Sequence, residues 1–153
     1  MNNHTYQDSQ ITTNSATVWV AEILQLHQSE GRTLTEAETK IALDVGVAYP
    51  DNIWIIVIDQ VPAPDIDILA KLRIQNGLQH SHTSGLALGY IVFLKNGLMN
   101  NYLLAHEFRH VYQFEKIGSI ERMILLYIQE IIKFGYQNAP LEMDAVKASS
   151  AYF

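Results

Sequence analysis

The pentad His-Glu-Phe-Arg-His at residues 106–110 constrains this chain more than any other feature. On a helix, residues four apart share a face, with Cβ atoms roughly 5–6 Å apart. His106 and His110 can therefore direct their imidazoles at one point, about 2.0–2.1 Å from a Zn²⁺ ion. Glu107 is displaced around the helix, where its carboxylate can reach a water bound to the metal. The pentad thus predicts a hydrolytic zinc site with Glu107 as general base.

The segment around the pentad has the properties of a central helix. Residues 101–116 contain neither Pro nor Gly, Asn100 or Asn101 can cap the start, and Gly118 follows the end. Apolar residues cover most of its circumference, which indicates burial on several sides. The alternative is a buried helix whose histidines are hydrogen-bonded core residues. Because each buried polar group would then need its own partner, we favour the metal site.

The composition limits the class of protein. With 153 residues, 48% of them hydrophobic and 17% charged, the chain has the make-up of one globular domain. We expect a flexible tail over residues 1–15 and a single domain over residues 16–153. The net charge of −6 argues against nucleic acid as a partner. Because there is no cysteine, any metal must be bound by histidine and carboxylate side chains.

The polar residues 1–15 lack the basic, apolar and small-residue regions of a secretory signal. The most apolar segment, residues 120–134, is too short and too charged to span a membrane. We therefore expect a cytoplasmic protein, with export by a route that needs no cleavable signal left open. The segment 120–134 is expected to be a core helix, and the alternative is the contact face of a homodimer.

Sequence patterns predict an α+β fold, mostly helical, with a short sheet of few strands beside the helix that carries the pentad. Apolar or β-branched runs predict two strands, over residues 53–59 and 86–94. Capping and periodicity predict six helices, over residues 16–28, 35–45, 65–77, 101–116, 120–134 and 141–149. Thr33 or Thr35 can cap the second of these helices, and Pro140 is placed to start the last.

A catalytic zinc site needs a third protein ligand besides the two histidines. The carboxylates that follow the pentad are those of Glu115, Glu121, Glu130, Glu142 and Asp144. Glu142 is favoured because it opens a new helix after a loop, so that the intervening helix can carry the chain away and back. Asp144 is the second choice as ligand, or it can orient a histidine through the outer ring nitrogen. The pair His80 and His82 is a weaker metal candidate, because an extended loop does not present both rings to one side.

The pentad followed by Glu142-x-x-Ala145 resembles the gluzincin pattern, in which the late glutamate is the third zinc ligand. Within that clan, residues 86–145 resemble the small metallopeptidase-like domains called DUF4157, or the extracellular contractile injection system core domain. The shared features are a Gly-containing strand, then Leu-Leu-Ala-His-Glu-x-x-His-Val-x-Gln, then Asn-Ala-Pro-Leu-Glu-x-Asp-Ala. Such proteins often have an acidic residue four positions after the late glutamate, and this chain has Val146 there.

The resemblance and the chemistry together imply a small zincin-like peptidase. Zn²⁺ would be held by His106, His110 and Glu142, Glu107 would be the base, and the partner would be a peptide or protein substrate. An extended peptide could pair with the strand that ends near Phe93, if that strand is a sheet edge. The candidate donors to the developing oxyanion are Tyr136, His80 and His82. Two alternatives are a non-catalytic binding or scaffold module that keeps the zincin fold, and a helical domain with a chance pentad.

Overall fold

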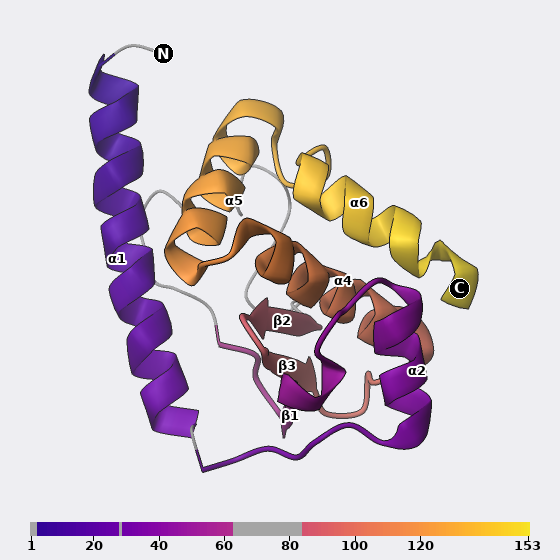
Figure 1. The fold of residues 1–153 in the computed structure, drawn as a ribbon. Helices are drawn as coiled ribbons and strands as arrows, with labels where there is room; N and C mark the ends of the chain where they lie inside the picture. Colours follow the sequence, from indigo (N-terminus) through magenta and orange to yellow (C-terminus); the bar gives the residue numbers. More distant parts are fainter. Residues whose placement is uncertain (1–2, 28, 63–83) are drawn as a thin grey trace.

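A small β-sheet packs beside the helix that carries the pentad, and the other helices surround this pair (Figure 1). The computed structural model describes residues 3–27, 29–62 and 84–153, with side chains from residue 14 onward. The described elements are α1 (Asn3–His27), α2 (Glu36–Asp44), β1 (Trp54–Ile58), β2 (Gly85–Leu88), β3 (Ile91–Lys95), α4 (Asn101–Ile117), α5 (Ile120–Phe134) and α6 (Pro140–Ser149), with short 3₁₀ turns at Pro50–Asn52 and Ser150–Tyr152. The predicted α+β class, mostly helical with a short sheet, is confirmed.

The described sheet has three strands in the order β1-β3-β2. β1 runs parallel to β3, with Trp54 opposite Ile91, and β2 runs antiparallel to β3. The central strand β3 is the most deeply buried of the three, since Val92, Phe93 and Leu94 are fully buried. The strand that ends near Phe93 is therefore not a sheet edge, and the expectation that a peptide pairs with it is wrong. The outer strand on the side of α4 is β2.

The prediction of one strand over residues 86–94 is also wrong, because the chain folds back in the middle of that run. Leu88 pairs with Ile91, so Gly89 and Tyr90 form a two-residue hairpin turn. Gly89 has φ +63°, whereas the φ of Tyr90 is not positive. This is the arrangement of a type II′ turn, which requires glycine at its first central position. The apolar residues on both sides of Gly89 concealed the turn in the sequence.

Helix α4 lies between the sheet and α6, and it also contacts α2 and α5 (Figure 1). Its start is capped by Asn100, whose side-chain oxygen accepts the backbone N–H of Leu103 at 2.8 Å. It ends at Gly118, which adopts a left-handed conformation with φ +92°. Both boundaries were predicted. Phe108 and Val111 are fully buried in the core, which fixes how the helix is rotated about its axis.

Helix α1 begins at Asn3, so the prediction that it starts at Ala16 is wrong. Residues 1–15 contain no Pro or Gly, and their polar side chains lower helix propensity without preventing a helix. α1 packs along α5. The helix predicted over residues 120–134 is α5, where Ile128 and Ile131 are buried, as expected for a core element. Its use as a homodimer face stays a prediction.

The remaining helices follow their local signals. Thr35 and Glu38 form the capping box of α2, in which the Thr35 side chain accepts the N–H of Glu38 and the Glu38 carboxylate accepts the N–H of Thr35. Pro140 is the first residue of α6. The helix predicted over residues 65–77, together with His80 and His82, lies outside the described residues. Within the described part of the chain, no helix is both long and apolar enough to cross a membrane.

Candidate metal centre

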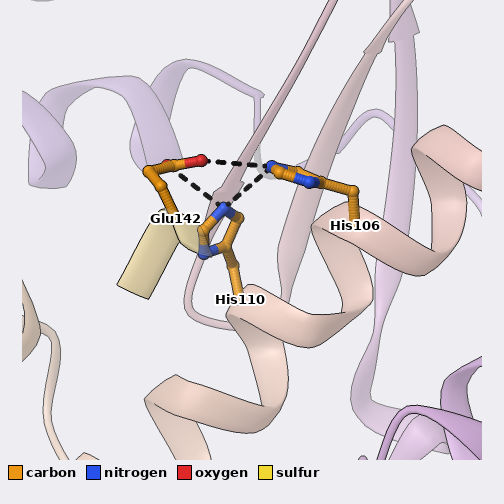
Figure 2. A group of neighbouring side chains, drawn as sticks. All are labelled: His106, His110 and Glu142. Carbon is orange, nitrogen blue, oxygen red and sulfur yellow. Dashed lines mark hydrogen bonds and ion pairs between the residues drawn. The ribbon is translucent and has the colours of Figure 1, made fainter. Parts of the chain in front are cut away.

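His106, His110 and Glu142 point toward one another from α4 and α6 (Figure 2). The two Nε2 atoms are 3.3 Å apart. One carboxylate oxygen of Glu142 is 3.3 Å from Nε2 of His106, and the other is 3.3 Å from Nε2 of His110. The structure thus brings together the two histidines of the pentad and the favoured late glutamate, close enough to hold one metal ion.

The charges of this group are strongly coupled. Burial alone would raise the pKa of Glu142, but its hydrogen bonds with His106 and His110 and their charges outweigh burial and hold that pKa well below its usual range. Burial alone would lower the pKa of His110, because it also disfavours the charged form of a histidine. The hydrogen bond and negative charge of Glu142 outweigh burial and raise this pKa to about 9. Without a metal, a proton on His110 therefore takes the place of the cation beside an ionised Glu142.

A hydrogen-bond chain fixes which nitrogen of His110 faces the metal position. The side-chain NH₂ of Gln113 donates to the backbone oxygen of Leu141 at 2.9 Å and to Asp144 at 2.8 Å. Both partners are acceptors, so the oxygen of Gln113 must face Nδ1 of His110, 2.8 Å away. Nδ1 therefore carries hydrogen, and in the neutral ring Nε2 has its lone pair free for a metal.

Asp144 lies outside the group that can hold the metal. Its carboxylate accepts two hydrogen bonds from Arg109, at 2.8 and 3.0 Å, in addition to the one from Gln113. These partners lower the pKa of Asp144, the hydrogen bond from Arg109 most of all. The structure thus places Asp144 two hydrogen bonds away from His110, which it orients through Gln113. Arg109 also donates to the backbone oxygen of Val45, which ties α2 to the same network.

Glu107 is buried beside strand β2 and has 5% of its surface exposed. The backbone N–H of Ala87 donates to its carboxylate. Burial raises the pKa of Glu107, although the charges of His110 and His106 lower it in part. A side chain at Gly85 would collide with this carboxylate, because a Cβ there would lie 2.7 Å from Oε1 of Glu107. Gly85 therefore leaves the space that Glu107 occupies.

Two of the other carboxylates considered as ligands, those of Glu115 and Glu130, have other partners. Glu115 accepts the backbone N–H groups of Ala48 and Tyr49 and the hydroxyl of Tyr90. The carboxylate of Glu130 accepts the N–H of Leu141 and so secures the start of α6. Neither belongs to the described group of residues close enough to share a metal.

A pocket of about 390 Å³ adjoins the metal centre. His106, Glu107, His110 and Glu142 all line it, as does Tyr136, one of the residues considered as an oxyanion donor. All residues of β2 line the pocket, together with residues of α1, α4 and α5. The centre therefore opens onto a space large enough for part of a substrate.

Three residues of the site were not found from the sequence. Gln113 orients His110, and Gly85 makes room for Glu107. Tyr127 of α5 donates its hydroxyl to Glu142 at 3.1 Å, and burial raises its pKa well above the ordinary value, so it stays a donor. The spacing of Gln113, three residues after His110 on one helix, was a usable signal. No such signal exists in the sequence for Tyr127, because its partner Glu142 lies on another helix.

No known protein family, curated protein or solved structure matches this chain. The arrangement of its own residues must therefore carry any statement about function.

Proposed function

We propose that this protein is a zinc-dependent peptidase of the gluzincin type. The observation that carries the proposal is the convergence of His106, His110 and Glu142 beside a buried Glu107 at the end of an open pocket. This is the ligand set and the base that the pentad and the late glutamate imply by their resemblance to gluzincins. The finer assignment to the DUF4157 domains belongs to the same proposal.

The donor atoms fit a zinc ion. In a tetrahedral complex with bonds of about 2.05 Å, neighbouring donor atoms are roughly 3.3 Å apart. The two imidazole Nε2 atoms are 3.3 Å apart, and each is 3.3 Å from one oxygen of Glu142, a different oxygen for each ring. Two imidazoles and one carboxylate also form a common catalytic zinc set, and they leave one coordination position for water. A bound Zn²⁺ would lower the pKa of that water to about 7 and polarise the substrate carbonyl.

The residues around the metal then have distinct tasks. Glu107 takes a proton as the water oxygen forms a bond to the carbonyl carbon, and it delivers that proton to the amine nitrogen as the C–N bond breaks. Burial raises its pKa, which makes the carboxylate a stronger base for the first of these steps. Gln113 keeps His110 in the tautomer that can bind metal, and Tyr127 holds Glu142.

Strand β2 supplies a place for the substrate backbone. It is the outer strand of the described sheet, and residues 85–88 line the pocket next to Glu107. An extended peptide can add to such a strand through backbone hydrogen bonds. Because the N–H of Ala87 donates to Glu107, the peptide would bind through the other outward-facing backbone groups of β2. A peptide on β2 would pass the metal centre, since α4 packs against that strand.

Two measurements test the proposal. Purified protein should retain about one zinc per chain, and less than about 0.3 equivalents would refute the metal site, given the affinity of such centres. Glu107→Gln should keep the zinc and lose peptide hydrolysis by about 10²–10⁴-fold, the usual contribution of a general base. The matched control is Glu115→Gln on the same helix, which should alter stability and leave zinc binding intact. If Glu107→Gln retains full cellular activity, the protein is a zincin-fold binding or scaffold module instead.

A further inference from the structure

The pocket beside the metal centre has an apolar part that the proposed mechanism does not use. Trp19 and Val20 of α1 face it from one side, and Met123 and Ile124 of α5 from another. We propose that this part binds a large apolar side chain of the substrate peptide next to the bond that is cut, and that Trp19 decides which side chains fit. The proposal rests on the peptidase function and adds its specificity.

The size of the pocket suits a large side chain. A dry apolar cavity of about 150 Å³ is enough to hold a benzene molecule, and pockets for small ligands begin at about 300 Å³. At about 390 Å³, this pocket has room for an aromatic or branched aliphatic side chain and for the backbone beside it.

The residues that line this pocket disfavour a charged side chain of the substrate. Among the described residues that line the pocket, the charged ones are His106, Glu107, His110 and Glu142, all of which belong to the metal centre. A charged substrate side chain placed between α1 and α5 would lose its hydration without a partner of opposite charge. An apolar side chain there would instead be removed from water, which favours binding by roughly 10- to 150-fold for a residue the size of leucine or phenylalanine.

The residue proposed to determine this specificity, Trp19, lies on helix α1 in the N-terminal part of the chain. The segment that resembles gluzincins begins at residue 86, whereas Trp19 and Val20 precede it by more than sixty positions in the printed sequence. Val20 is buried, so α1 is seated firmly against the rest of the protein at this point. The neighbouring Val18 is 59% exposed and does not line the pocket, which makes it a matched control on the same helix.

Binding is measured with blocked peptides that are identical except for one central residue, Phe, Leu, Ala or Glu. The protein is zinc-loaded Glu107→Gln, in which turnover is blocked, with Trp54→Phe added so that Trp19 is its single tryptophan. The Phe and Leu peptides should change the emission of Trp19 in a saturable manner, with affinities at least about tenfold above those of the Ala and Glu peptides. Fluorescence anisotropy of labelled peptides should give the same order.

Substitution then tests the role of Trp19. Trp19→Ala should reduce the preference for Phe over Ala by about tenfold or more, whereas Val18→Ala should leave it unchanged. Circular dichroism and zinc content show whether each variant is folded. If Trp19→Ala does not fold, Trp19→Phe serves instead, and it should move the optimum toward bulkier side chains.

The outcomes separate this proposal from the peptidase function. Equal affinity for all four peptides, or a preference for Glu, would overturn the apolar specificity even if the protein cuts peptides. A Trp19 response to decanoate with none to any peptide would overturn it in favour of a lipid ligand. If the wild-type protein cuts no peptide but the preference for Phe and Leu persists, the peptidase function fails and the specificity of the pocket stands.

Discussion

Zinc binding should release a proton from His110, and the affinity should therefore rise with pH. Glu142 raises the pKa of His110 to about 9, and a histidine must be neutral to bind a metal. A pH of 7 is about two units below this pKa, so His110 is neutral in roughly one metal-free molecule in a hundred. Displacing the proton then costs about 3 kcal/mol, at about 1.4 kcal/mol for each unit.

The linkage is measured by titration calorimetry with zinc in buffers of different ionisation enthalpy. We expect close to one proton per zinc from His110 at pH 7, and an affinity that rises by about tenfold per pH unit toward pH 9. Glu142 should contribute no proton, because its pKa is lowered and it is already ionised.

A matched variant isolates the cause. Glu142→Gln removes the charge that holds the proton on His110, so the proton release at a given pH should fall along with the zinc affinity. Tight zinc binding by the wild-type protein with less than about 0.3 protons released at pH 7 would show that His110 is neutral in the free protein, and the reasoning from its contact with Glu142 would be refuted.

Three further predictions concern the same residues. Gly85→Ala should push the carboxylate of Glu107 aside and lower kcat by about 10²-fold or more while zinc content stays at the wild-type level, as colorimetric zinc assays would show. Gln113→Leu removes the acceptor for Nδ1 of His110, and competition with a chelator should reveal a zinc affinity that is about 10- to 100-fold lower. In the metal-free protein, the raised pKa of His110 gives stability that is complete below about pH 6.5 and is lost as the pH rises through about 9, so thermal melts should show a midpoint that falls across this window. A melting midpoint that stays constant between about pH 6.5 and about pH 9 would contradict this prediction for His110.

The fold was predictable where signals are local. The cap at Asn100, the stop at Gly118 and the capping box at Thr35 each act within a few residues, and the structure has all three. The hairpin at Gly89 was missed because apolar residues on both sides of a glycine read as one strand unless the pairing partner is known. The start of α1 was missed for a related reason, since a polar segment without Pro or Gly can be helical or not, depending on its context.

The site was predictable to the extent that one helix carries it. The four-residue spacing of the two histidines places both rings on one face of α4, with Glu107 beside them. The choice of Glu142 needed a further argument, because it reaches the histidines from α6 and the sequence gives no distance between the two helices. Tyr127 and Gly85 were beyond reach, because each acts on a residue of another element through a contact that only the packed structure defines.

The packing of α6 onto α4 explains how so small a chain can hold its ligands in place. Arg109 and Gln113 alternate with the metal-facing histidines along α4, and both bind Asp144, two residues after Glu142. The contacts that fasten α6 therefore come from the same turns of α4 that bear the ligands. Asp144 is well placed for this task because it lies outside the group that could hold a metal and keeps both oxygens for Arg109 and Gln113.

Val146 stands where the proteins that this chain resembles often have an acidic residue. Val146 is 49% exposed, and the helix face on which it lies is turned toward solvent. In this chain Asp144 braces His110 through the amide of Gln113. These hydrogen bonds form between protein groups alone, so the two imidazoles and the carboxylate of Glu142 are brought together without a metal. We therefore expect zinc binding to add little ordering of the chain, in contrast to small domains that fold only when they bind their metal.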